Sequence, residues 1–206
     1  MTSLSTKFSA GDMMESPLHH HVAHTNHSDA GIVMKEDKFR GHLNLRGNPK
    51  DTAFTSAVES VLGVALPTTA NTSVRSGDTV VYWLGPNEWL VTSATDAIDL
   101  ESSLRLKIRG HIAVVDVSGG QTLVNLRGHG VPVLLKKASG YDFHSWSGAL
   151  PGAGRCVQTT FAKATAIVAN RTDGSFDLII RRSFSDYIAQ WLLDAGQEVG
   201  CRIESC

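Results

Sequence analysis

The chain has 206 residues, long enough for one large domain or two small ones, and its 42% hydrophobic residues are typical of a globular protein. A formal net charge of −1 excludes the broad basic field of a nucleic-acid-binding protein, and the low charged fraction of 19% favours a chain that buries surface in an assembly. No apolar run approaches the roughly 20 residues that cross a bilayer and no secretory signal pattern opens the chain, which predicts a cytoplasmic protein without membrane contact.

The first 38 residues differ from the rest because Ser, Thr, Met, Asp and His dominate them and no apolar period occurs. Residues 1–38 are expected to form an N-terminal arm, extended or partly disordered, outside the core. Five of the nine histidines fall between His19 and His27, and imidazoles at such density can bind Zn, Ni or Cu. Without cysteines beside them, adventitious affinity is the preferred interpretation and no metal site is assigned. Ordering of the arm against a partner chain stays open as an alternative.

The folded region is expected to begin near Phe39, with a half-buried strand at residues 42–47, where polar and apolar residues alternate. Asp51 is suited to cap the helix that follows. Apolar residues recur at helical spacing over residues 54–62, and Gly63 ends the pattern.

The densest apolar run, residues 79–93, predicts a β-hairpin at the centre of a core. Val80 to Trp83 are β-branched or aromatic, Gly85-Pro86-Asn87 forms the turn, and Trp89 to Val91 resumes the strand. A short strand is expected just before it, at residues 73–75.

A second helix is predicted after a cap at Asp96, with apolar residues four apart over residues 100–108 and an end at Gly110. A buried strand at residues 112–117 follows. Residues 42–117 therefore read strand, helix, strand, strand, helix, strand. This is the order of a ferredoxin-like βαββαβ unit, with both helices on one face of its sheet.

The second half starts like the first, because residues 124–128 echo residues 43–47 and an amphipathic helix again follows, over residues 131–138. A Gly-rich loop lies at residues 145–154, and Ser183-Phe184-Ser185-Asp186 resembles a capping box that opens a closing helix. Further strands are expected at residues 155–161, 164–169 and 176–181. The predicted fold is thus α+β, one domain over residues 39–206 made of two ferredoxin-like halves at about 39–118 and 119–206.

No set of residues combines a nucleophile, an acid and a base. Ser118 lacks the spacing of a nucleophile elbow, and the Ser118-Gly119-Gly120-Gln121 turn lacks the Lys of a phosphate-binding loop. A strand cysteine such as Cys156 is usually inert core unless a histidine folds beside it; the candidates are His111, His129 and His144. The cysteines Cys156, Cys201 and Cys206 have no C-x-x-C spacing and are expected to be reduced thiols.

The remaining polar candidates receive structural interpretations. His42 and His129 adjoin strand ends and are expected to be satisfied structural histidines. Asp116, Arg127, Arg181 and Arg182 are expected to form buried ion pairs, within the chain or across an interface, rather than to catalyse. No catalytic, cofactor-binding or metal-ligating residue is therefore assigned.

Four motifs, in this order, carry a resemblance to a known family. They are His42-Leu43-Asn44-Leu45-Arg46-Gly47, Leu84-Gly85-Pro86-Asn87-Glu88-Trp89-Leu90-Val91, Val115-Asp116-Val117-Ser118-Gly119-Gly120-Gln121 and Arg182-Ser183-Phe184-Ser185-Asp186-Tyr187. Together with Ser16-Pro17-Leu18, they resemble the gamma subunit of bacterial heterotetrameric sarcosine oxidase over about residues 16–200.

The resemblance implies a complex of alpha, beta, gamma and delta chains that oxidatively demethylates sarcosine to glycine and makes hydrogen peroxide. The one-carbon unit leaves as methylene-tetrahydrofolate or as formaldehyde. The resemblance places FAD, FMN and NAD in the large alpha and beta chains, and the tetrahydrofolate site in alpha. It implies no cofactor in the gamma chain itself.

The resemblance also implies a fold similar to the folate-binding domain of the aminomethyltransferase (T-protein) of the glycine cleavage system. This chain is much shorter than T-protein and lacks the C-terminal region that helps to wall the folate cavity, so no catalytic residue is carried over. The leading hypothesis is a non-catalytic structural subunit. The alternative is a small folate- or anion-binding enzyme of the aminomethyltransferase type, with Asp116 and the turn at Gln121 near its ligand.

Overall fold

The computed structural model describes residues 15–21, 29–146 and 153–204. Within these ranges the strands are β1 (Ile32–Asp37), β2 (Gly41–Arg46), β3 (Thr72–Ser76), β4 (Thr79–Gly85), β5 (Glu88–Ser93), β6 (Ala113–Asp116), β7 (Gln121–Arg127), β8 (Ala153–Phe161), β9 (Ala164–Asn170), β10 (Phe176–Arg181) and β11 (Cys201–Glu204). The helices are α1 (Thr52–Leu62), α2 (Ala97–Lys107), α3 (Val131–Ala138) and α4 (Ser185–Ala195).

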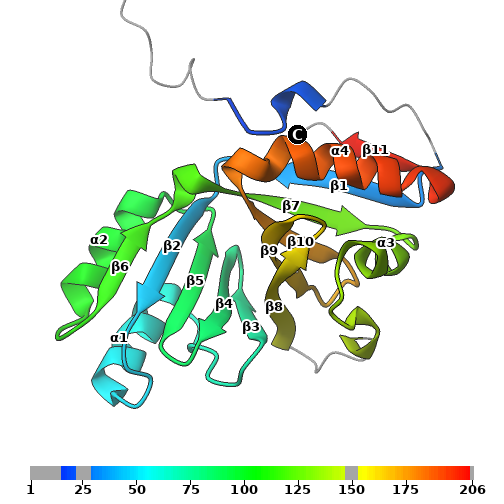
Figure 1. The fold of residues 1–206 in the computed structure, drawn as a ribbon. Helices are drawn as coiled ribbons and strands as arrows, with labels where there is room; N and C mark the ends of the chain where they lie inside the picture. The colour runs from blue at the N-terminus through cyan, green and yellow to red at the C-terminus, as the bar shows by residue number, and fades with distance from the viewer. Residues whose placement is uncertain (1–14, 22–28, 147–152, 205–206) are drawn as a thin grey trace, which may run out of the picture.

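All of these strands join one sheet in the order β11-β1-β7-β10-β9-β8-β3-β4-β5-β2-β6. The two halves of the chain divide the sheet between them and meet where β3 pairs with β8. Each half carries its own pair of helices, α1 and α2 on the first and α3 and α4 on the second (Figure 1). The α+β class and the two-half plan that the sequence predicts are confirmed.

The first half has the predicted ferredoxin-like strand order, β4-β5-β2-β6, with β3 added beside β4. Its first helix forms where the local signals place it. The Asp51 carboxylate caps α1 by accepting from the backbone N–H of Ala53 at 2.9 Å. Gly63 ends the helix with a positive φ of 68°, a conformation that favours glycine.

The predicted hairpin is also confirmed, as β4 and β5 joined at Pro86 and Asn87. Trp89 is fully buried in the core of the first half, and its indole N–H donates to the carbonyl of Pro67 at 2.8 Å. Trp83 lies opposite Trp89 in the register and is only partly buried. The hairpin therefore anchors the first-half core mainly through Trp89.

Two details of the first half correct the sequence analysis. The helix α2 ends at Lys107, before the predicted stop at Gly110, and its C-cap residue Ile108 has an extended backbone. The strand predicted to be buried at residues 112–117 is β6, the last strand of the sheet, and Val115 on it is 50% exposed. Because an edge strand lacks a neighbour on one side, its apolar run does not guarantee burial on both faces.

The second half differs from the prediction at its edge. In a ferredoxin-like unit the fourth strand pairs with the first, yet the neighbour of β7 here is β1, from the N-terminal segment. β1 runs antiparallel to β7, and β11 pairs with β1 in parallel on the outside. Leu18, Ile32 and Met34 are buried in the second-half core. Treating all of residues 1–38 as an arm outside the core is therefore wrong for β1, whereas the division into domains stays a prediction.

The predicted capping box does not form. Ser183 lies in a 3₁₀ turn, and α4 begins at Ser185 with Phe184 at the N-cap position and no side-chain cap. Asp186 lies in the first turn of α4, where its carboxylate contacts Gln190 and histidines of the N-terminal segment. The Asp186 side chain therefore bonds to distant residues instead of closing a capping box. The Gly-rich loop predicted at 145–154 lies partly outside the described residues.

Three apolar clusters form the core of the part of the chain that the structure describes. One lies under α1 and α2, and a second under α3 and α4. The third joins the faces of the two half-sheets that carry no helix, and it includes Tyr82, Leu90 and Ile179. Strand alternation sets this division, because Leu178 faces the helices of its half while Asp177 and Ile179 face the other half. The interface between the halves is where polar side chains converge.

Candidate functional site

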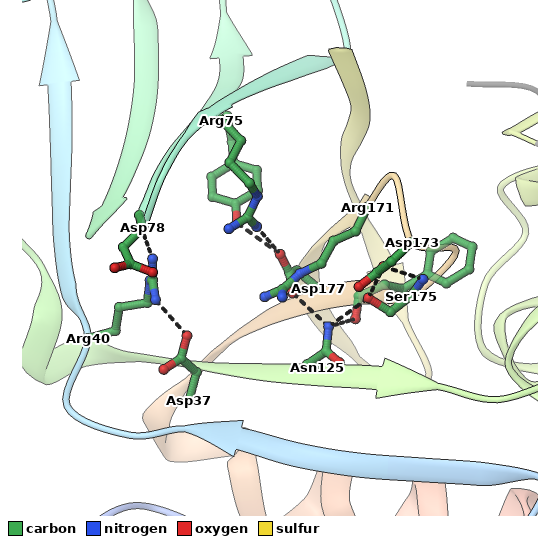
Figure 2. Close-up of polar contacts among 11 residues, drawn as sticks. Asp37, Arg40, Arg75, Asp78, Asn125, Arg171, Asp173, Ser175 and Asp177 are labelled. Atoms are coloured by element: carbon green, nitrogen blue, oxygen red, sulfur yellow. Dashed lines mark hydrogen bonds and ion pairs between the residues drawn. The ribbon is translucent and has the colours of Figure 1, made fainter. Parts of the chain in front are cut away.

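A buried carboxylate, that of Asp177 on β10, lies at the interface between the halves and is 1% exposed. Arg171 holds one of its oxygens with two guanidinium nitrogens, Nε at 2.7 Å and Nη2 at 2.6 Å. The amide of Asn125 donates to the same oxygen at 3.1 Å (Figure 2). These three residues belong to the second half, and together they neutralise the charge that burial would otherwise penalise.

The first half supplies the donors to the other oxygen of Asp177. Arg75 on β3 lies 3.3 Å from it, and the hydroxyl of Tyr82 on β4 donates at 3.4 Å. Burial, followed by the charge of Asp177, raises the pKa of Tyr82, so the phenol stays protonated as a donor. Asp177 therefore links strands from both halves and has its lone pairs occupied.

Within the described residues, both oxygens of Asp177 are engaged by donors of the chain itself. A general acid or base must reach a proton on its substrate, whereas the Asp177 oxygens are already engaged by donors of the chain. The cavity beside it measures about 40 Å³ and is lined by Ser73, Arg75, Tyr82 and Asp177, among others. Since one water needs about 10–15 Å³, the cavity has room for a few waters. It has no room for a pterin.

A second polar bridge between the halves involves Arg40, which lies in the connection between β1 and β2. One guanidinium nitrogen donates to Asp37 at 2.7 Å, at the end of β1. Another donates to the backbone carbonyl of Asp78, just before β4 (Figure 2). Arg40 therefore ties the N-terminal strand to the first half.

The Asp116 to Gln121 turn, which the alternative hypothesis places near a ligand, connects the two halves. Asp116 accepts from the backbone N–H of Ser118 at 2.9 Å and from its hydroxyl at 2.6 Å. The Ser118 hydroxyl also accepts from the backbone N–H of His42 at 2.9 Å. The His42 ring contacts Gln121 Oε1 at 3.1 Å instead. Ser118 thus has no imidazole base, and the turn is held by its own hydrogen bonds.

His42 is the satisfied structural histidine that the sequence predicts. It is 1% exposed, and burial lowers its pKa, with the Gln121 hydrogen bond opposing that shift. The ring is therefore neutral at pH 7.

A surface groove of about 360 Å³ lies beside this turn. Its carboxylates outnumber its two arginines, which disfavours an anionic ligand such as folate. Two of its apolar side chains are strongly exposed, Phe39 at 58% and Ile98 at 68%. The groove is lined by Glu15, Phe39, Arg40, Gly41, Asp96, Ala97, Ile98, Asp116, Ser118, Gly119 and Arg182.

Cys156 is inert core. Its sulfur contacts the backbone carbonyls of Thr72 at 3.2 Å and Trp83 at 3.4 Å, and burial raises the pKa of the thiol to about 12. His111 and His129 are exposed, and the side chain of His144 lies outside the described residues. Both cysteines within the described ranges, Cys156 and Cys201, are free thiols; Cys206 lies outside those ranges.

The ion pairs differ from those predicted. Arg127 pairs with Glu204 on β11, but its side chain is 47% exposed. Arg182 donates to the backbone carbonyl of Glu15 at 3.1 Å, and Arg181 is exposed at the end of β10. Asp116 is exposed as well. The buried ion pair is formed instead by Asp177 with Arg171. The sequence-based prediction does not include it, although an Asp within the otherwise apolar strand Phe176–Arg181 indicates a buried, paired carboxylate.

The comparisons with known proteins decide the family. The model of the sarcosine oxidase gamma subunit family matches residues 46–198. This chain belongs to the sarcosine oxidase gamma subunit family. The resemblance inferred from the four motifs is thereby confirmed. Relatives of the family include the sarcosine oxidase subunit gamma of Arthrobacter sp., which is 27% identical over 198 residues, or 94% of this chain and 95% of the relative. That of Corynebacterium sp. strain U-96 is 27% identical over 173 residues, or 82% of each chain.

The fold of this gamma-family chain also has solved counterparts. A chain of the heterotetrameric sarcosine oxidase from Corynebacterium sp. U-96 matches with a TM-score of 0.79 at 23% identity, over 90% of this chain and 96% of that one. The aminomethyltransferase T of the glycine cleavage system from Bartonella henselae matches with a TM-score of 0.57 at 14% identity, over 85% of this chain and 48% of that one. The expected likeness to the T-protein fold is confirmed. Among the described residues, no helix has the length and apolar character to cross a bilayer.

Proposed function

We propose that this chain is the gamma subunit of a heterotetrameric sarcosine oxidase and contributes structure, not catalytic groups, to the demethylation of sarcosine. Membership of the gamma family is the observation that carries the proposal. The site geometry supports it, because Asp177 is saturated with donors, Ser118 lacks a base and Cys156 is a buried thiol.

We further propose that the partners are the alpha, beta and delta subunits, and that FAD, FMN, NAD and tetrahydrofolate are bound in the partner chains within the cytoplasm. Six large apolar side chains are at least 41% exposed: Phe39, Ile98, Leu106, Val115, Val133 and Phe184. Two of them, Phe39 and Ile98, line the same surface groove, which supports burial of that groove against a partner. The buried free thiols are compatible with a reducing compartment.

Co-expression tests this function directly. The four chains together should form a complex that consumes oxygen in the presence of sarcosine, while the purified gamma chain alone should show no turnover. A complex prepared without this chain should fail to assemble or should lose activity. Sarcosine oxidation by the isolated chain, or its failure to co-purify with the other subunits, would overturn the proposal.

Ligand binding separates this function from the aminomethyltransferase alternative. Equilibrium dialysis of the isolated chain against tetrahydrofolate should show no binding at high micromolar concentrations, because the cavity between the halves measures about 40 Å³. Saturable binding that Asp116→Asn abolishes would favour the alternative.

A further inference from the structure

The N-terminal segment crosses α4 as a short 3₁₀ helix, His19–His21 (Figure 1). Two of its imidazoles meet the carboxylate of Asp186 in the first turn of α4. His20 Nε2 lies 3.0 Å from Asp186 Oδ1, and His21 Nε2 lies 2.6 Å from the same oxygen. Residues from the two ends of the chain thus place two ring nitrogens on a single carboxylate oxygen.

The three atoms form the donor set of a transition-metal site. One ligand atom from each of His20, His21 and Asp186 lies within 4.8 Å of the other two. Around a four-coordinate zinc ion with bonds of about 2.0–2.1 Å, ligand atoms lie about 3.3 Å apart. The observed separations of 3.0 and 2.6 Å therefore have to widen by less than about 1 Å to admit an ion.

The surroundings hold these ligands in place. Gln190, one turn along α4, donates its amide to Asp186 Oδ2 at 3.2 Å, which leaves Oδ1 directed at the histidines. Such outer hydrogen bonds orient metal-ligating carboxylates. On the histidine side, Leu18 is buried in the second-half core and its N–H donates to Glu36 at 3.3 Å. The 3₁₀ helix is therefore anchored at a fixed position over α4.

Exposure leaves room for entry of an ion and for a water. The side chain of His21 is 10% exposed, whereas those of His20 and Asp186 are 51% and 55% exposed. Two imidazoles with one carboxylate suit zinc and neighbouring metals, while magnesium and calcium prefer all-oxygen sites. Three protein ligands with an open position are a usual zinc arrangement.

We propose that His20, His21 and Asp186 bind one divalent transition-metal ion of the zinc class, through both Nε2 atoms and Oδ1, with water as the fourth ligand. The ion replaces the hydrogen bonds that join the rings to Asp186, and each histidine binds as neutral imidazole with its proton on Nδ1. The bound ion ties the segment before β1 to α4. The site goes beyond the subunit role and does not depend on it.

The test is zinc binding by the full-length chain, measured by competition with a chromophoric chelator. Wild type should bind one equivalent, and Co²⁺ should give the visible absorption of a four-coordinate site. Asp186→Asn and His20→Gln should each weaken binding at least tenfold. Gln190→Ala should weaken it to a smaller degree. Circular dichroism checks that each variant is folded.

Two controls separate this site from general histidine affinity. His111→Gln removes an exposed histidine elsewhere and should leave zinc affinity unchanged. The double variant His24→Gln/His27→Gln removes two further histidines of the N-terminal cluster and should also retain affinity. If the double variant loses zinc while Asp186→Asn binds like wild type, the affinity belongs to the histidine-rich stretch and the proposal is overturned. Absence of zinc binding by the folded wild type would overturn it equally.

Discussion

Met34 on β1 lies in register with Leu126 on β7, and both side chains are buried in the core of the second half. The pair joins the N-terminal segment to the middle of the chain. It also explains why β7 has no exposed edge, since β10 pairs with its other side. The N-terminal strand is therefore part of the domain core.

Replacement of Met34 by Ala should destabilise the chain by about 2–5 kcal/mol, because it deletes a side chain that is 2% exposed. Lys35→Ala, on the exposed face of the same strand, should change stability by about 0.5 kcal/mol or less. Urea unfolding of the purified chain measures both. Equal midpoints for the two variants would contradict a core role for β1.

Asp177→Ala should cost about 2–4 kcal/mol, since it leaves Arg75 and Arg171 at the interface without their anion. The value lies below that of a fully buried pair because these arginines are 38% and 26% exposed and water screens them. Glu59→Gln, at an exposed carboxylate on α1, should be nearly neutral. Urea unfolding of the two variants and the wild type measures the difference in the free energy of unfolding.

Activity of the assembled oxidase provides the second readout for this carboxylate. A purified complex with Asp177→Asn should retain its turnover with sarcosine, because the oxygens of Asp177 serve the chain itself. A stable, correctly assembled complex that has lost turnover would show that the carboxylate takes part in the chemistry.

Trp89→Ala should destabilise the first half by about 3–5 kcal/mol and lower the yield of assembled complex. The indole is 0% exposed and packs beside Phe54 with ring centroids 6.0 Å apart. Trp89→Phe keeps an aromatic ring but loses the hydrogen bond to Pro67, so it should lower stability and assembly less than Trp89→Ala does. Size-exclusion chromatography of co-expressed subunits follows assembly. Normal assembly and stability of the Ala variant would argue against Trp89 as the core anchor.

Stability should fall as the pH rises from about 9 towards 12. Burial raises the pKa of Cys156 to about 12 and that of Cys201 to about 11. Unfolded thiols titrate near about 8.5, so above that pH the unfolded chain loses protons that the folded chain keeps. Urea unfolding at several pH values measures the slope, which Cys156→Ala should reduce. An unchanged slope in that variant would contradict the burial argument.

Local signals made the first half predictable from sequence. Asp51 and Gly63 set the two ends of α1 through contacts within a few residues. The turn at Pro86 and Asn87 likewise sets the position of the hairpin. The closing helix is predictable too, but its predicted capping box does not form, because the Asp186 carboxylate bonds to histidines from the N-terminal segment. Patterns that depend on neighbours in sequence were recognised, and patterns that depend on distant partners were not.

The strand β1 and the contacts of Asp177 are also difficult to predict from sequence, because both depend on distant partners. In β1 only Ile32, Val33 and Met34 are apolar, and the buried Glu36 at the next inward position interrupts the alternation. Glu36 is satisfied by Thr122 at 2.7 Å, on a strand far along the chain. Asp177 likewise takes donors from β3, β4 and β7, so its role depends on the packing of the two halves.

The position of β1 between β7 and β11 determines when the sheet of the second half can form during synthesis of the chain. β1 is made before the other described strands, yet one neighbour, β7, comes from the middle of the chain and the other, β11, is the last of those strands to be made. Such long-range pairing is slow to form and leaves strand edges open in the meantime. The first ferredoxin-like unit can begin to close while the ribosome is still translating, but the second cannot be completed until β11 has been made. A nascent chain that stops short of β11 would keep β1 as an open edge, ready to pair with another chain.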